Sequence, residues 1–321
     1  MQTYLKTRPV WMQLLLFFGI AMASFMIAGL IGSTALSKMT GISMASLQNM
    51  SSWDPANPAY TTYIRGMLAV QFVFLWVLPP VVFSYLADPR QPMKFLGLSM
   101  PGNHLFWLLG ILVMVVGYPF VEYIGYINQK LIVSTGGENW MKTLEEQALK
   151  QMQLMFRERT MTELLLNLLC IALFAGIGEE LFFRGILQRL LIKSTRNAWV
   201  GILLTAIIFS GFHMQFYGFL PRLFLGALLG AIYWYSGSLW VAILVHFLYD
   251  AVGVTLIHYN PQMLQNANET IIKGEWQLLM GAMISLALTF ALLQQMQKRS
   301  VASYEAVYND ELPKQTDDFS F

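Results

Sequence analysis

Charged side chains are scarce in this chain of 321 residues. Asp, Glu, Lys and Arg together make up 12% of the sequence, whereas hydrophobic residues make up 56%. Soluble globular chains usually carry about 25% charged residues, so this chain has too little charge to cover a water-soluble globule of its size. The net charge of +2 provides no strong field for binding nucleic acid. Cys170 is the only cysteine, which excludes an intramolecular disulfide.

Two further signatures are missing. The sequence has no glycine-rich phosphate-binding loop, and it has no evident internal repeat. Many secondary transporters are built from such repeats, with interrupted helices in both halves. The missing repeat therefore argues against a transporter, although a weak inverted repeat can escape inspection.

Long apolar runs account for most of the hydrophobic residues. A helix needs about 20 predominantly apolar residues to cross a bilayer, and about eight segments meet or approach this length. We therefore predict an all-α, polytopic membrane protein. The approximate cores of the predicted helices are Trp11–Gly32, Gly66–Leu86, Leu105–Ile127, Leu164–Leu191, Ala198–His213, Phe219–Tyr235, Leu239–Ile257 and Trp276–Leu293.

The remaining segments suggest a topology and a packing site. Basic residues in the short loops favour a cytoplasmic N-terminus and a cytoplasmic C-terminus. The stretch from Glu138 to Glu158 is typical of an amphipathic surface helix, and the polar tail after Ser300 is expected to be disordered. Gly226 and Gly230 are spaced for close packing between membrane helices.

Ionisable residues inside the predicted fourth helix are unexpected, because a charge at the centre of a membrane helix costs about 2.5–3.5 kcal/mol on insertion scales. The segment from 178 to 184 reads Gly-Glu-Glu-Leu-Phe-Phe-Arg. Glu180 and Arg184 are spaced i, i+4 with the acid first, which favours an ion pair. Glu179 is turned away by about 100° and lacks a local partner. A buried carboxylate of this kind can act as a general base.

Two histidines fall in later apolar segments. His213 ends the predicted fifth helix, four residues after Phe209, and His246 lies in the seventh. His246 and Asp250 are again spaced i, i+4, so they share a helix face. Asp250 could orient the imidazole or help to polarise a substrate carbonyl.

Each of these features also has a structural interpretation. A single buried histidine is often a satisfied core residue, and the two glutamates with Arg184 could form a structural ion pair or part of a proton-coupled transport path. The chain has four histidines, and two of them fall in late apolar segments that follow this carboxylate pair. This coincidence makes the structural interpretations less favourable. The residues alone do not name a reaction.

The three clusters, in this order, resemble the CPBP family of intramembrane proteases, which includes the Ras-converting CAAX endopeptidases and the bacterial Abi proteins linked to bacteriocin processing and immunity. The family pattern is E-E-x-x-x-R, then F-x-x-x-H, then H-x-x-x-N or H-x-x-x-D. The resemblance extends over roughly 164–257. The matching anchor residues are Glu179, Glu180, Arg184, Phe209, His213, His246 and Asp250.

The resemblance implies peptide hydrolysis within the membrane. Glu179 and His213 would then activate the attacking water, while His246 and Asp250 would stabilise the developing oxyanion. Glu180, with Arg184 and Phe209 in support, would hold the site together. These roles supply the base and the carbonyl polarisation that peptide hydrolysis needs.

A metal requirement is a separate question, because the family has been described both as metalloproteases and as glutamate proteases. Glu179, His213 and His246 could ligate zinc with one position left for water. The sequence lacks a His-Glu-x-x-His helix, the strongest motif for that chemistry. We therefore favour a metal-independent mechanism with no obligatory cofactor, and zinc is the alternative.

We divide the chain into residues 1–160, an N-terminal membrane region of three helices with the amphipathic segment; 161–258, the catalytic helix core; 259–299, the last loop and membrane helix; and 300–321, the polar tail. The expected substrate is a membrane-associated or CAAX-like peptide or protein, which can carry a lipid, and membrane lipid is the other expected partner. A bacterial plasma membrane is the expected location. The alternatives are a proton- or ion-coupled transporter and a catalytically silent scaffold or immunity protein.

Overall fold

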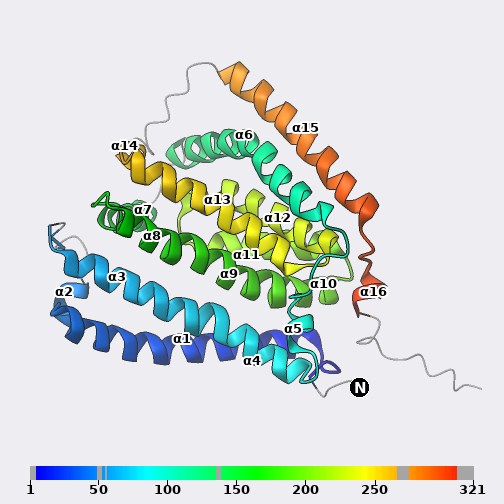
Figure 1. Ribbon diagram of the computed structural model, residues 1–321, viewed down its shortest axis with the longest axis horizontal. Coiled ribbons are helices and arrows are strands. Elements are labelled where there is room, and N and C mark those ends of the chain that lie inside the picture. Colours follow the sequence, from blue (N-terminus) through cyan, green and yellow to red (C-terminus); the bar gives the residue numbers. More distant parts are fainter. Residues whose placement is uncertain (1–4, 49–52, 55, 135–138, 266–274, 309–321) are drawn as a thin grey trace, which may run out of the picture.

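The computed structural model describes residues 5–48, 53–54, 56–134, 139–265 and 275–308, and these described ranges contain helices and no strand (Figure 1). The all-α prediction is confirmed. The main helical segments are α1 (Val10–Thr40), α3 (Pro58–Gln71), η2 (Phe72–Val77), α4 (Leu78–Ala87), α6 (Leu105–Ser134), α7 (Asn139–Met155), α8 (Met161–Asn167), η3 (Leu168–Leu173), α9 (Phe174–Glu179), η4 (Glu180–Gln188), α10 (Arg189–Thr195), α11 (Ala198–Phe212), α12 (Phe219–Ser236), α13 (Leu239–Tyr259) and α15 (Glu275–Arg299). The short segments are α2 (Met44–Gln48), α5 (Pro92–Phe95), η5 (Phe216–Gly218), α14 (Gln262–Gln265) and α16 (Tyr304–Tyr308).

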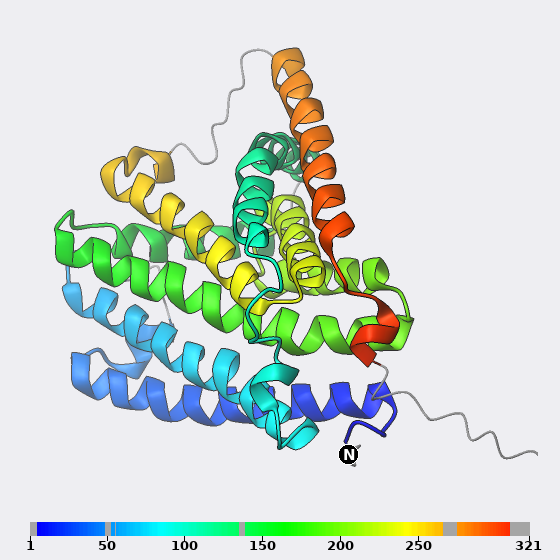
Figure 2. The ribbon, with the colours of Figure 1, turned by 45° about the vertical axis from the view of Figure 1, so that its right-hand side comes forward.

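The long helices are arranged around a central group (Figures 1 and 2). Helix α1 packs along α3, η2 and α4 on one side of the molecule, and α15 packs along α6 on the other side. Between them lie the continuous helix formed by α8, η3, α9, η4 and α10, together with α11, α12 and α13. All the charged clusters identified in the sequence belong to this central group.

Seven helices are long and apolar enough to cross a membrane, among the residues that the structure describes. They agree with seven of the predicted segments. The eighth, α11, has 15 residues, which extend about 22 Å at 1.5 Å per residue. That length is less than the roughly 30 Å of a hydrocarbon core. His213 follows the last residue of this short helix.

The outer helices expose large apolar side chains. Leu30 of α1 is 69% exposed, and Met280 of α15 is 65% exposed. Such continuous apolar faces are unusual on a soluble monomer, whereas lipid tails solvate them well. The protein is therefore an integral membrane protein, and its helices are held together by close packing and by hydrogen bonds between helices.

Three parts of the spanning helices have wide, π-helical turns. The N–H of Leu78 bonds to the carbonyl of Val73, and the N–H of Phe174 bonds to the carbonyl of Leu169, five residues earlier in both cases. A third such segment, η4, spans Glu180–Gln188 and carries the Glu180–Arg184 pair. π-helical turns are rare in proteins, and those that occur often lie at functional sites. They change the direction in which later side chains point.

Ser285 forms hydrogen bonds with the backbone of α6 next to Pro119, which interrupts this helix. Proline interrupts the regular helical hydrogen bonding, and a polar backbone group left unpaired in lipid is costly. Ser285 of α15 enters this gap: the N–H of Phe120 donates to Ser285 Oγ at 3.2 Å, and Ser285 Oγ donates to the carbonyl of Val116 at 2.5 Å. Helix α15 thus completes the backbone bonding of α6.

The predicted glycine pair does pack closely. A Cβ at Gly226 would come within 3.1 Å of Phe209, and a Cβ at Gly230 would come within 2.9 Å of Ile202. Both neighbours belong to α11. The two glycines therefore let α11 and α12 approach each other beside the charged cluster.

The prediction of a disordered tail is wrong for its first part. Helix α16 packs against α10: Tyr308 is 1% exposed, and its hydroxyl donates to the carbonyl of Arg189 at 2.7 Å. The hydroxyl of Tyr304 donates to the carbonyl of Lys193 at 3.3 Å. The contacts of these two tyrosines keep the segment ordered although its composition is polar. Residues 309–321 lie outside the described residues.

We predict that Ser285→Ala lowers the free energy of unfolding by about 1–3 kcal/mol, because the N–H of Phe120 and the carbonyl of Val116 lose their partner. Thermal unfolding of the purified protein in detergent would measure the loss. Ser33→Ala is the matched control, since among the described residues the Ser33 hydroxyl bonds only to the Leu30 carbonyl of its own helix, at an exposed position. Equal effects of the two substitutions would contradict the proposed role of Ser285.

Candidate active site

An ion pair between Glu180 and Arg184 lies at the centre of the molecule. Both side chains are fully buried, and Arg184 Nη1 donates to Glu180 Oε1 at 2.6 Å. Arg184 also donates from Nη2 to the carbonyl of Gly226 at 2.9 Å, and its guanidinium lies 4.7 Å from the centre of the Phe209 ring. The predicted pair is present, and Phe209 supports it from α11.

His246 of α13 connects this pair to the second predicted cluster. Its Nδ1 donates to Glu180 Oε1 at 2.8 Å, and its Nε2 lies 3.4 Å from Asp250 Oδ2. Gly176 allows the contact, because a Cβ there would come within 3.1 Å of the Phe247 backbone. The close approach of α9 and α13 thus holds the imidazole between two carboxylates.

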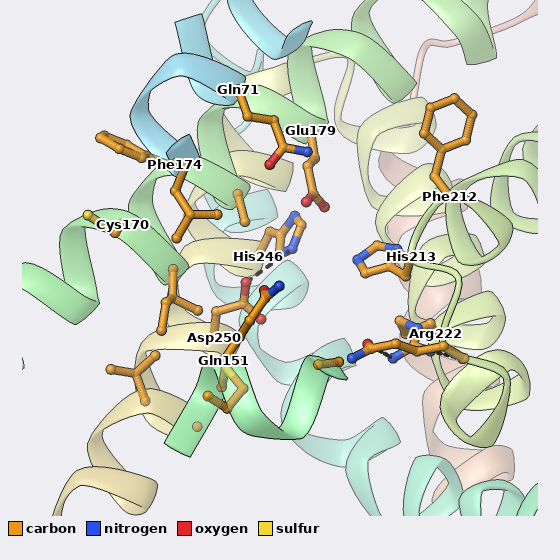
Figure 3. Close-up of a pocket in the computed structure, with 18 of the residues that line it drawn as sticks. Gln71, Gln151, Cys170, Phe174, Glu179, Phe212, His213, Arg222, His246 and Asp250 are labelled. Carbon is orange, nitrogen blue, oxygen red and sulfur yellow. Dashed lines mark hydrogen bonds and ion pairs between the residues drawn. The ribbon is translucent and has the colours of Figure 1, made fainter. Parts of the chain in front are cut away.

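Glu179 differs from Glu180 although the two are adjacent. Within the described part of the chain, its carboxylate forms no hydrogen bond or ion pair, and it points into a cavity toward His246 and His213 (Figure 3). Its carboxylate is available to a bound molecule.

His213 enters the same cavity from the end of α11. Its Nδ1 lies 2.9 Å from the carbonyl of Phe209. Because a carbonyl oxygen only accepts hydrogen bonds, Nδ1 carries a proton, and Nε2 of the neutral ring is an acceptor. Phe209 therefore orients His213 through its backbone while its ring supports Arg184.

The cavity has a volume of about 700 Å³ and contains Glu179, His213, His246 and Asp250 in its lining. Helix α7 forms part of the wall through Gln147, Gln151 and other residues. The predicted amphipathic segment is therefore a helix that covers the site as well as lying at the surface.

Sequence reasoning missed several polar residues in this lining, among them Gln71, Gln151 and Arg222 (Figure 3). The glutamines carry no charge, so no signal distinguished them. Arg222 is different. It lies inside the predicted helix Phe219–Tyr235, so the reasoning that identified Glu179 as an unexpected charge applies to it as well.

The donor groups do not form a ready zinc site. No group of three or more His, Cys, Asp or Glu side chains could hold a metal ion, within the ranges that the structure describes. Both ring nitrogens of His246 face carboxylates, whereas a zinc ligand needs one nitrogen directed at the metal. The alternative set of Glu179, His213 and His246 thus needs rearrangement to bind zinc.

We predict that Arg184→Met lowers the free energy of unfolding by about 3–5 kcal/mol, because it leaves the buried Glu180 charge without its cation. Unfolding in detergent would measure this. Glu158→Gln is the control, since Glu158 pairs with Arg157 at the surface, and such pairs contribute about 0–1 kcal/mol. Should Arg184→Met fail to fold, Arg184→Lys would keep the charge but lose the planar fork, with a smaller loss. A loss from Arg184→Met no larger than the control's would contradict the prediction.

Two comparisons with known proteins bear on this site. Residues 161–252 match the family model described as type II CAAX prenyl endopeptidase Rce1-like. The chain is also similar to an uncharacterized 24.3 kDa protein of Escherichia coli, with 26% identity over 201 residues that cover 61% of this chain and 78% of the relative. No solved structure matches. The matched segment contains all seven residues of the candidate site, so the resemblance to the CPBP family is confirmed over residues 161–252, which are similar to the Rce1-like type II CAAX prenyl endopeptidases.

Proposed function

We propose that this protein is an intramembrane endopeptidase that cleaves a membrane-associated or CAAX-like peptide with water activated by Glu179 and His213. The observation that carries the proposal is the unpaired Glu179 carboxylate, which shares a membrane-embedded cavity with His213 and with the fixed His246. The Rce1-like match over the same residues supports a protease of this general type.

The reaction would proceed in two proton-transfer steps. Glu179 takes a proton from water, whose oxygen attacks the scissile carbonyl carbon, and His213 Nε2 accepts a hydrogen bond that orients this water. The tetrahedral intermediate carries a negative oxygen. His246 would stabilise it by sharing its Nε2–H, which faces Asp250 at 3.4 Å, between that carboxylate and this oxygen. Glu179 then returns the proton to the leaving nitrogen as the carbon–nitrogen bond breaks.

The fixed groups have a different task. Glu180 accepts a hydrogen bond from His246 Nδ1, and Arg184 fixes Glu180 in turn. The imidazole is therefore already in position when negative charge develops. The scarcity of water around these buried groups strengthens each electrostatic interaction. No step is routed through a metal ion, and zinc dependence is a question for the experiment below.

The contacts of the two chain ends support the proposed topology. The N-terminal segment and α16 both contact the end of α10, through the carbonyl of Lys6 and the hydroxyl of Tyr304. Both segments therefore lie at one end of the helix bundle, which agrees with N-in and C-in topology. We propose a bacterial plasma membrane and a peptide or protein substrate that reaches the cavity from the lipid or from the cytoplasmic side.

We predict that Glu179→Gln reduces cleavage of a quenched CAAX-like peptide panel by at least about 100-fold, because the base is lost. The assay would use purified protein in detergent, with its zinc content quantified, and thermal unfolding would show that the variant is folded. Glu146→Gln, on the exposed face of α7, is the matched control and should cleave like the wild type.

The outcomes separate the mechanisms. Cleavage by metal-free wild type that is lost in Glu179→Gln would support the glutamate mechanism. Cleavage that requires bound zinc would instead make Glu179, His213 and His246 a metal site. Full activity of Glu179→Gln would overturn the assigned role, and Glu179-dependent uptake into proteoliposomes without any cleavage would favour a transporter.

A further inference from the structure

Arg222 stands at the junction of two cavities. It lies near the start of α12, lines the catalytic cavity and also lines a second cavity of about 790 Å³ between α6, α12 and α13. Leu225 and Tyr249 are shared by the two cavities in the same way. Figure 3 shows the Arg222 side chain directed into the catalytic cavity beside His213. A peptide that extends from the catalytic groups into the second cavity would pass this side chain.

The guanidinium of Arg222 is held by a neutral residue. Nη1 donates to Gln215 Oε1 at 3.0 Å, Nη2 donates to the Gln215 carbonyl, and Nε is buried without a partner. No acidic side chain in the described part of the chain lies within ion-pairing distance of Arg222. By contrast, Arg65 and Arg184, which also lie in spanning helices, contact Glu163 and Glu180 respectively. The charge of Arg222 is therefore not neutralised by a contacting anion.

Glu145 of α7 is the acidic group with the larger electrostatic effect on Arg222, ahead of Glu179. Its charge interacts with that of Arg222, yet the two form no ion pair, and Glu145 Oε2 is buried without a hydrogen-bond donor. Burial raises the pKa of the Glu145 carboxyl, and the positive charge of Arg222 acts in the opposite direction. Glu145 thus leaves the guanidinium open to another carboxylate.

We propose that Arg222 is a specificity residue that binds a carboxylate of the peptide substrate, on the part that extends toward the second cavity. The inference rests on the proposed function. A guanidinium binds carboxylate through two parallel hydrogen bonds, and this geometry distinguishes it from an ammonium group. The carboxylate is either the C-terminus of the peptide or an acidic side chain. Arg222 acts in binding, and Glu179 remains the base.

Three forms of one fluorescently labelled apolar peptide would test the proposal: a free C-terminal acid, the C-terminal amide, and the amide with a glutamate near its end. We expect the wild type to prefer one carboxylate form over the plain amide by about 10- to 100-fold in kcat/KM, mainly through KM. Arg222→Gln should cleave all three at the amide rate, and Arg222→Lys should keep part of the preference. Whether the acid or the glutamate peptide is preferred identifies the source of the carboxylate.

Arg299→Gln is the matched control, because Arg299 also donates to a glutamine side chain, Gln295, but at the exposed end of α15. It should retain the wild-type preference. If Arg222 only holds Gln215 and the loop after His213, then Arg222→Gln would slow cleavage of all three peptides equally. That outcome, or a wild type without any carboxylate preference, would overturn the proposal.

A binding measurement separates this inference from the proposed function. Fluorescence anisotropy with the folded Glu179→Gln protein measures the affinity for each uncleaved peptide, with and without the additional Arg222→Gln change. A carboxylate preference that disappears with Arg222 supports the inference even if the wild type cleaves none of the peptides, and in that case the protease proposal fails alone. Equal affinity for all three peptides, independent of Arg222, overturns the inference even if cleavage is observed.

Discussion

The buried contact between Glu180 and Arg184 is the interaction on which the central helices depend. Neither charge would be stable alone in a membrane interior. Together they also bind partners on two other helices, since Glu180 accepts from His246 of α13 and Arg184 donates to Gly226 of α12. One ion pair therefore fixes the relative positions of three helices. Because lipid tails provide little hydrophobic driving force between helices, such polar contacts have a large share in specifying the arrangement.

Adjacent glutamates on one helix have different surroundings for a geometrical reason. Glu180 is directed toward the buried cation and the imidazole, whereas Glu179 is directed into the cavity. The wide turns of η3 and η4 change the direction of the side chains along this helix, next to the point where Glu179 and Glu180 diverge. The site thus combines a buried, ion-paired centre with Glu179, which lines the cavity at its edge without an ion pair in the described part of the chain.

Much of the site could be predicted because it depends on local spacing. The pairs Glu180–Arg184 and His246–Asp250 are both i, i+4, and helical periodicity alone places each pair on one face. The bond between His246 and Glu180 could not be predicted in this way, because it joins residues 66 positions apart through the packing of Gly176 on α13. The position of α7 over the cavity was equally inaccessible, since amphipathicity predicts a surface helix without saying which surface it covers. Arg222 could have been found, because a charge in an apolar helix is visible in the sequence.

The serine that enters the backbone of α6 has a consequence for how the chain is made. The carbonyl of Val116 and the N–H of Phe120 obtain their partner from Ser285, about halfway along the last spanning helix. During synthesis α6 enters the membrane long before α15 exists, so its proline break must first be solvated by water, by lipid headgroups or by the insertion machinery. These two hydrogen bonds can form only after α15 has been synthesised. A chain truncated before Ser285 would therefore leave these two backbone groups of α6 without the partner that α15 supplies.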